Sequence, residues 1–160
     1  MLLHLIRHAD AGDPDAWEGP DAARPLSDKG RNQAQRLGSF LTGIKFGGRP
    51  FITSPKLRAA QTADLVASEL EAPVVIDERL AGPLTTEIVE AILRDAGDPD
   101  RPVLVGHDPD FSDLVAELCG DARFPMRKGA LALIELDRPV RAGAGTLRWL
   151  LPPDALKPKR

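Results

Sequence analysis

Short apolar runs alternate with longer amphipathic stretches along the first 120 residues of this 160-residue chain. The runs have the length and aliphatic composition of buried strands, and they lie at residues 1–6, 51–53, 74–76 and 103–105. The stretches repeat apolar residues at intervals of three and four, which predicts helices at 28–43, 57–70, about 85–96 and 109–119. This alternation indicates an α/β fold in three layers (α/β/α), with helices on both faces of a mostly parallel central sheet. Two further strands are expected at 131–136 and 146–151.

Two of the predicted helices have clear start signals. Ser27 has the residue type of an N-cap, and Asp28 follows it in the first turn, where the helix dipole favours an anion. Asp108 is expected to cap the fourth helix, with Pro109 at its first position. Residues 9–26 are rich in Asp, Gly, Pro and Ala and predict a long loop, which in a compact domain tends to be functional or mobile.

Composition narrows the class of protein. With 42% hydrophobic and 28% charged residues, the chain is expected to form a single domain over residues 1–152, followed by a flexible basic tail at 153–160. A net charge of −3 gives no reason to expect nucleic-acid binding. The single Cys119 excludes an intramolecular disulfide bond. Because no apolar segment reaches the roughly 18 residues of a membrane span, we expect a cytoplasmic protein without membrane association.

Three of the predicted strands end in polar residues of similar chemistry. The first ends at Arg7 and His8, the second at Ser54 with Arg58 one turn into the next helix, and the fourth at His107. In open parallel sheets, ligands bind beyond the carboxyl ends of the strands, so these side chains are expected to meet at one edge. Two arginines and two histidines beside a helix N-terminus would suit a dianionic phosphoryl group and its transfer.

Two rival interpretations of these residues are weaker. Three histidines without a nearby cysteine, among arginines that repel cations, make a poor metal site, so no metal is expected. Ser54 lacks the surroundings of a hydrolase nucleophile, and Pro55 beside it favours a turn. His4 alternates away from His8 along its strand and is expected to be packed, whereas Arg24 and Lys56 either widen a cationic rim or are surface charges.

Four motifs in order resemble the histidine phosphatase superfamily, which has the phosphoglycerate-mutase-like fold. They are LIRHAD at residues 5–10, PLSDKGRNQA at 25–34, TSPKLRAAQT at 53–62 and VGHDP at 105–109. Within the superfamily, the short chain and the RHADA opening are similar to the SixA-type phosphohistidine phosphatases.

The resemblance implies a role for each matching residue. His8 would be the nucleophile that becomes transiently phosphorylated, and Arg7, Arg58 and His107 would hold the phosphoryl oxygens. Ser54 and Asp10 complete the expected substrate-binding set. The implied enzyme is a phosphatase that needs neither a metal nor another cofactor.

One expected residue is missing. Larger superfamily members carry a glutamate soon after the third strand that protonates the leaving group, whereas this chain has Ala81 and Gly82 there. Glu78 and Glu87 are weak candidates for a general acid. A phosphohistidine substrate tolerates this gap, because a protonated imidazole leaves more easily than an alkoxide. With no large insertion after the second helix, the site is expected to be open to a protein surface.

The sequence therefore favours dephosphorylation of phosphohistidine in a protein of the histidine-containing phosphotransfer type. One alternative is a small-molecule phosphomonoesterase. The other is a module that binds a phosphorylated ligand with little turnover. Nothing in the sequence indicates an oligomeric state.

Overall fold

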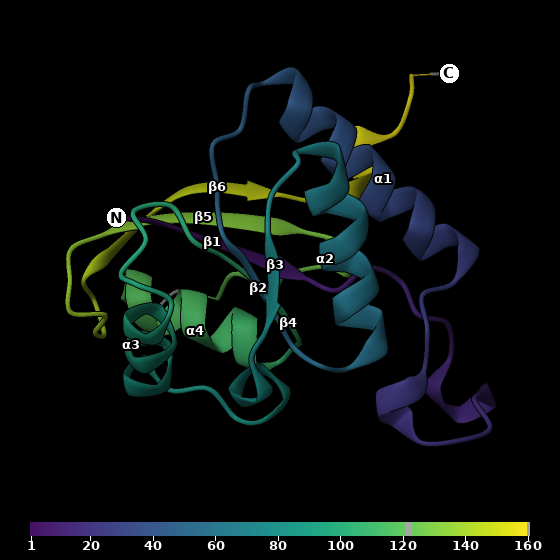
Figure 1. Ribbon diagram of the computed structural model, residues 1–160, viewed down its shortest axis with the longest axis horizontal. Helices are drawn as coiled ribbons and strands as arrows, with labels where there is room; N and C mark the ends of the chain where they lie inside the picture. The colour runs from purple at the N-terminus through teal and green to yellow at the C-terminus, as the bar shows by residue number, and fades with distance from the viewer. Residues whose placement is uncertain (121–122, 160) are drawn as a thin grey trace.

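The computed structural model, which describes residues 1–120 and 123–159, is built on one six-stranded sheet (Figure 1). Its strands are β1 (Leu2–Arg7), β2 (Phe51–Thr53), β3 (Val74–Ile76), β4 (Val103–Gly106), β5 (Leu131–Leu136) and β6 (Gly145–Leu151). In the order β3-β2-β4-β1-β5-β6, the first four strands are mutually parallel. β5 runs antiparallel to β1 and pairs antiparallel with β6. The predicted mostly parallel sheet is confirmed.

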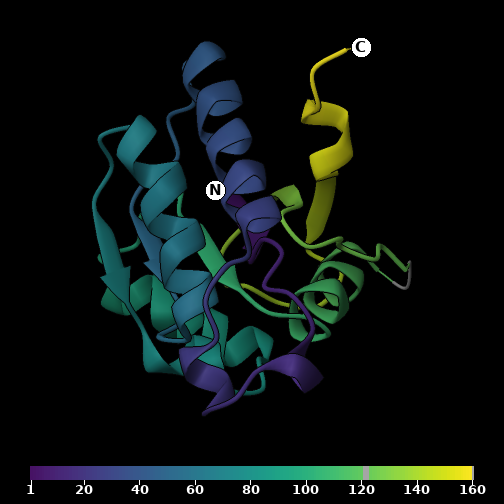
Figure 2. The same ribbon diagram turned by 90° about the vertical axis from the view of Figure 1, so that its right-hand side faces the viewer.

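Helices cover both faces of this sheet. The described part of the chain forms four α-helices, namely α1 (Asp28–Gly43), α2 (Leu57–Glu69), α3 (Thr86–Asp95) and α4 (Asp110–Cys119). Helices α1 and α2 lie on one face, and α3 and α4 lie on the other (Figures 1 and 2). Short 3-10 helices occupy four connections, η1 (Pro14–Ala16), η2 (Asp21–Ala23), η3 (Glu78–Ala81) and η4 (Pro153–Leu156). The three-layer α/β/α prediction is therefore confirmed.

Alternation along β1 divides the core in two. Leu3 and Leu5 belong to the apolar cluster beneath α3 and α4, whereas Ile6 belongs to the cluster beneath α1 and α2. His4 is fully buried, its Nδ1 donates to the carbonyl oxygen of Pro102 at 3.0 Å, and its ring lies edge-on to Phe46. His4 is thus a packing residue, as its place in the strand predicted.

The two predicted helix starts have different outcomes. The Ser27 hydroxyl accepts a hydrogen bond from the Gly30 amide at 3.1 Å, so the predicted cap of α1 is confirmed. The prediction for α4 is wrong by one residue, because Pro109 is the N-cap and the helix begins at Asp110. The Asp108 carboxylate still serves the first turn, since it accepts from both the amide and the hydroxyl of Ser112.

The end of the chain also differs from expectation. A flexible tail was expected from residue 153, but η4 (Pro153–Leu156) packs beside α1 (Figure 2). Pro153 is buried, and Leu156 packs against the apolar cluster beneath α1 and α2. An apolar side chain at residue 156 therefore fixes a segment whose basic composition suggested disorder.

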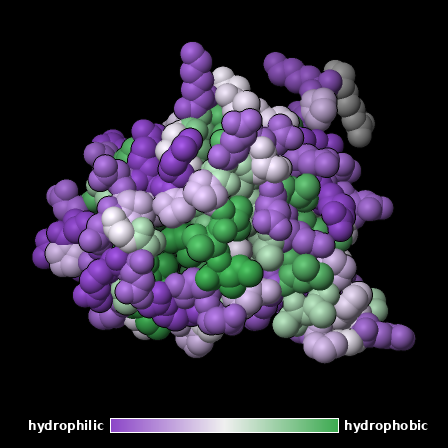
Figure 3. All heavy atoms as spheres, in the orientation of Figure 1, coloured by the Kyte–Doolittle hydropathy of each residue, from purple (hydrophilic) through white to green (hydrophobic). Residues whose placement is uncertain are grey.

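The rest of the surface is mostly polar. Figure 3 shows apolar side chains gathered near the middle of one face, where the short edge strand β3 exposes Val75 and Ile76. Across the parts of the chain that the structure describes, we find no helix with the length and hydrophobicity needed to span a bilayer.

Candidate active site

His8 lies at the carboxyl end of β1, in the middle of the sheet. Its amide donates to the Gly106 carbonyl oxygen of the β4 side at 2.9 Å, and its own carbonyl accepts from the Gly129 amide at 3.0 Å. The next amide, that of Ala9, donates to the Thr62 hydroxyl of α2 at 3.1 Å. Backbone hydrogen bonds from three directions thus fix the position from which the imidazole projects.

The imidazole of His8 has a defined tautomer. Its Nδ1 lies 2.7 Å from the Ala9 carbonyl oxygen, and because a carbonyl can only accept, Nδ1 carries the proton. Burial lowers the pKa of His8 to about 4; the charges of Arg58, Arg7 and Lys128 act in the same direction, against the opposing effect of the Ala9 carbonyl. At neutral pH the ring is therefore uncharged, with an unprotonated Nε2.

His107 faces His8 from the end of β4. The two ring centroids are 5.3 Å apart, and His107 Nε2 lies 2.8 Å from the Ser54 hydroxyl at the end of β2. Burial lowers the pKa of His107 to about 3, with further lowering by His8, Lys56 and Arg58. Ser54 also accepts from the Lys56 amide at 3.2 Å, so its hydroxyl orients His107.

Arg7 and Arg58 flank the histidines. The Nη1 of Arg7 donates to the Met126 carbonyl oxygen at 2.6 Å and lies 3.4 Å from the Asp108 carboxylate. The guanidinium of Arg58 donates to the backbone and side-chain oxygens of Asp21, each at 2.9 Å. Both guanidinium groups are thus held in place by oxygens of the protein.

Three buried polar atoms at this site have no hydrogen-bond partner. They are Arg7 Nε, Arg58 Nε and His107 Nδ1, and elsewhere in the described residues only His4 Nε2 shares this property. An unsatisfied buried donor costs about 1–3 kcal/mol. Three such atoms around His8 are therefore best explained by an anion that completes their hydrogen bonds.

Asp21, in η2, is a site residue that the sequence reasoning missed. Burial raises its pKa, but hydrogen bonds and charges from Arg58 and Arg24 outweigh this effect and hold the pKa below its usual value. Arg24 is buried, donates to Asp21 and the Ala11 carbonyl oxygen, and is thus neither a rim residue nor a surface charge. Nothing in the loop sequence distinguishes Asp21 from the aspartates around it.

Asp10 connects the site to helix α1. Its carboxylate accepts from the Ser27 hydroxyl at 2.6 Å and the Gly12 amide at 3.2 Å, and it lies 3.5 Å from the Lys128 ammonium. A Cβ added at Gly30 would meet the Asp10 carbonyl oxygen at 1.9 Å, so only glycine permits this approach. These contacts give Asp10 a structural place beside the site.

The two candidate general acids lie on the surface. Glu78 in η3 and Glu87 in the first turn of α3 are both exposed. A hydrogen bond with Thr85 lowers the pKa of Glu87, whereas a general acid that works at neutral pH needs a raised one. Within residues 1–120 and 123–159, no group of three or more His, Cys, Asp or Glu side chains is arranged to hold a metal ion.

Comparisons with known proteins agree with this geometry. The profile of the histidine phosphatase superfamily (branch 1) matches residues 3–82. Phosphohistidine phosphatase SixA of Escherichia coli (strain K12) is 30% identical, over 98% of this chain and 97% of its own. A solved structure of the protein histidine phosphatase SixA complexed with tungstate superposes with a TM-score of 0.84, at 30% identity, over 98% of this chain and 100% of that one.

Other similar proteins are named for small-molecule substrates. An 8-oxo-(d)GTP phosphatase of Mycolicibacterium smegmatis is 29% identical over 94% of this chain but only 48% of its own. A putative alpha-ribazole-5'-P phosphatase from Escherichia coli shares the fold, with a TM-score of 0.72 at 24% identity over 94% of this chain and 96% of that one.

Two findings establish the family of this chain. The family profile spans half of the chain, and a 30% identical relative aligns along nearly its whole length. The chain belongs to the histidine phosphatase superfamily, whose enzymes transfer a phosphoryl group through a phosphohistidine intermediate.

Proposed function

We propose that this phosphatase hydrolyses phosphohistidine in a protein, without a metal, through a covalent intermediate on His8. The observation that carries the proposal is the ring of unsatisfied donors around an unprotonated imidazole nitrogen. Arg7, Arg58 and His107 each present a buried nitrogen without a partner, and His8 holds its proton on Nδ1. Oxygens of a phosphoryl group would satisfy the donors and place phosphorus in front of His8 Nε2.

The first step exchanges one imidazole for another on phosphorus. The lone pair of His8 Nε2 attacks the phosphorus, and the bond from phosphorus to the substrate's imidazole nitrogen breaks. A substrate ring already protonated at its other nitrogen departs neutral, while His8, which keeps its Nδ1 proton, becomes the cationic phosphoimidazole. Because the proton that makes the leaving group neutral is already on the substrate, this step needs no general acid.

The second step regenerates the enzyme. Water attacks phosphorus, the bond to His8 Nε2 breaks with its electron pair returning to the ring, and dihydrogen phosphate leaves with both protons of the water. The guanidinium groups of Arg7 and Arg58 offset the negative charge on the transferring oxygens in both steps. If the Ser54 hydroxyl donates to His107 Nε2, the proton of His107 is on Nδ1, which can then donate to an oxygen of the phosphoryl group.

The carboxyl groups around the site support phosphohistidine over an alkyl phosphate. An alkoxide leaving group needs a proton, yet the pKa values of Asp10 and Asp21 lie below the usual range despite the opposing effect of burial. Both groups are therefore ionised at neutral pH and cannot donate a proton. The same holds for Glu87, whose pKa is lowered by its hydrogen bond with Thr85.

The relative that aligns along nearly its whole length supports the same substrate class. The 30% identical SixA is named as a phosphohistidine phosphatase, and its structure holds tungstate, a tetrahedral oxyanion like phosphate. We accordingly infer a phosphorylated protein of the histidine-containing phosphotransfer type as the partner, and cytoplasmic action.

Substitution of His8 tests the mechanism. Replacing His8 with alanine should reduce turnover of a phosphohistidine protein at least a thousandfold, because the group that forms the covalent bond is lost. The wild-type enzyme should hydrolyse the same substrate, and an aryl phosphate, in the presence of a chelator. Radiolabel on the enzyme should be lost in acid and retained in alkali if it is on a histidine, whereas a serine phosphoester would be stable in acid and lost in alkali. Unchanged activity in His8→Ala would contradict the mechanism.

The two alternatives give different results in the same assay. A small-molecule phosphomonoesterase should turn over an alkyl phosphate with a higher kcat/KM than a phosphohistidine protein. A binding module should retain the phosphoprotein with less than one turnover per enzyme molecule. Multiple turnovers with preference for the phosphohistidine protein exclude both alternatives.

A further inference from the structure

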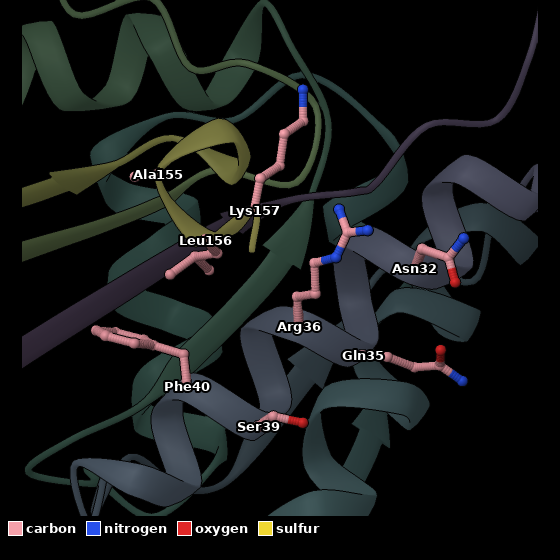
Figure 4. A pocket seen from close by; sticks show the side chains of 8 residues that line it. All are labelled: Asn32, Gln35, Arg36, Ser39, Phe40, Ala155, Leu156 and Lys157. Atoms are coloured by element: carbon pink, nitrogen blue, oxygen red, sulfur yellow. The ribbon is translucent and has the colours of Figure 1, made fainter. Parts of the chain in front are cut away.

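A trough runs away from the active site along the seam between α1 and η4. Its first part is a hollow of about 320 Å³ that shares Arg7 with the site and continues past Lys29 and Asp154. A second hollow of about 690 Å³ follows between Arg36 and Phe40 of α1 and Leu156 of η4 (Figure 4). Because residue numbers increase along both elements from the first hollow to the second, the two hollows follow one another along α1 and η4. We name the two hollows together the α1–η4 trough.

The part of the trough near the site is cationic in a chain whose net charge is −3. Its first hollow is lined by four cations and two aspartates, namely Arg7, Lys29, Arg127, Lys128, Asp10 and Asp154. Lys128 pairs with Asp10 at 3.5 Å and Arg127 with Asp154 at 3.4 Å, so the excess of positive charge rests on Arg7 and Lys29. Lys29 stands in the first turn of α1, where the helix dipole disfavours a cation, so local helix stability does not account for it. Arg36 follows seven residues later, on the same side of the helix.

The far part of the trough is apolar. Phe40 and Leu156 line the second hollow, and Phe40 also borders an adjoining depression formed with Trp149 and Leu151 of β6. Trp149 is 41% exposed, whereas tryptophan side chains are on average more deeply buried in folded domains. Phe40 lies eleven positions after Lys29 on α1, which corresponds to about 16 Å along the helix axis.

We propose that the α1–η4 trough is a docking surface for an acidic segment of the phosphorylated protein substrate. The segment carries carboxylates close to its phosphohistidine and an apolar side chain about 16 Å farther on, in register with Lys29 and Phe40. This inference rests on the proposed function and names the part of the substrate that gives it specificity. The apolar lining of the far hollow, Phe40 and Leu156, gives a polyphosphate no partner, so the combination of cationic and apolar parts favours a protein segment.

Two matched phosphohistidine peptides test the inference. Both carry phosphohistidine and a distal leucine, but one has aspartate and glutamate between them and the other has asparagine and glutamine. The wild-type enzyme should show a kcat/KM about tenfold higher for the acidic peptide, and this preference should shrink as salt is raised from 50 to about 500 mM. Lys29→Ala/Arg36→Ala should abolish the preference without altering hydrolysis of an aryl phosphate.

The control variant loses a charge from the same helix outside the trough. Arg31 is exposed on α1 and does not line either hollow, so Arg31→Ala should retain the wild-type preference. Equal loss in Arg31→Ala would assign the effect to general charge and overturn the proposal. Equal kcat/KM for the two peptides would overturn it while leaving the proposed function standing. Failure of the wild-type enzyme to hydrolyse either peptide, with aryl phosphate still turned over, would reject the proposed substrate class and this inference with it.

Fluorescence provides a second measurement that does not depend on turnover. In a His8→Ala/Trp17→Phe background, Trp149 is the one remaining tryptophan. The acidic peptide with its distal leucine should shift Trp149 emission to the blue, because the leucine covers the indole. A peptide with serine in place of leucine should bind without this shift. A shift of equal size with serine would exclude the apolar part of the docking surface.

Discussion

At the scale of single residues, the reactivity of His8 depends on the carbonyl oxygen of its neighbour Ala9. Since Nδ1 donates to that carbonyl at 2.7 Å, the lone pair of the neutral ring is on Nε2. Burial, with help from Arg58 and Arg7, lowers the pKa to about 4, so the nucleophile remains available well below neutral pH. An exposed histidine with an ordinary pKa near 6.5 would be largely protonated at pH 5.

The pKa of His8 can be tested directly. The ring nitrogen and carbon shifts of His8 in the free protein should remain constant from pH 7.5 to 5, because the neutral form persists over that range. NMR of a uniformly labelled protein measures this, with His8→Gln used to assign the signal. A titration centred near pH 6.5 would contradict the inferred burial and the cationic surroundings.

Sequence alone identified the residues that lie at strand ends. Arg7, His8 and His107 follow apolar runs, and a parallel sheet brings such ends together, so their convergence could be predicted. The contact of Asp21 with Arg58 could not, because it joins a loop without periodicity to a helix 37 residues away. Only the folded path of residues 9–26 decides which of several aspartates meets the guanidinium.

At the scale of elements, the position of α1 depends on a glycine near its start. A Cβ atom at Gly30 would lie 1.9 Å from the carbonyl oxygen of Asp10, so this oxygen would have to move. Asp10 is two residues after His8. The backbone of the loop that follows the nucleophile therefore lies directly against Gly30 of helix α1, with no room for a methyl group.

Alanine substitutions at two glycines of α1 test this packing. Gly30→Ala should lower the free energy of unfolding by about 3 kcal/mol and reduce kcat, because overpacking displaces the loop behind His8. At Gly43, the last residue of the same helix, an added Cβ meets nothing within 4 Å. Gly43→Ala should therefore leave activity unchanged and raise stability by up to about 1 kcal/mol. Urea denaturation and initial rates measure both effects, and similar stability of the two variants would disprove the close contact.

Element boundaries were harder to predict than elements. Periodicity located all four helices, but Asp108 reaches forward to Ser112 instead of capping α4 directly, a choice that depends on the local turn. Composition likewise suggested a loose end after residue 152, whereas contact of Leu156 with α1 orders η4. Both differences arise from tertiary contacts that a local pattern does not contain.

At the scale of the whole molecule, three buried histidines link folding to pH. The pKa values of His4 and His8 are lowered to about 4 and that of His107 to about 3, chiefly by burial. Their unfolded values lie near 6.5, so between about pH 4 and 6.5 the unfolded chain binds more protons than the folded one. The free energy of unfolding must therefore rise with pH across this window and fall as the medium is acidified.

Replacing His4 separates the contribution of this histidine to the pH dependence of stability from the contribution of the carboxylates. His4→Gln keeps a hydrogen-bond donor for the Pro102 carbonyl but cannot titrate. The loss of stability between pH 7 and 4.5 should shrink by up to roughly 3 kcal/mol relative to the wild-type protein, while activity at pH 7 is retained. Urea unfolding at a series of pH values gives the slope, and parallel curves for the two proteins would contradict the lowered pKa.

The position of residue 1, at the far end of β1 from the active site, has a practical consequence for attaching other groups to this protein. The amino group of Met1 donates to the Leu136 carbonyl oxygen at 3.0 Å, at the opposite end of β1 from His8. Six strand residues place the nucleophile about 20 Å from that point. Residues 153–157, in contrast, line the trough beside the site. A solid support, dye or fusion partner should therefore be attached through residue 1, where it leaves both the catalytic pocket and its approach free.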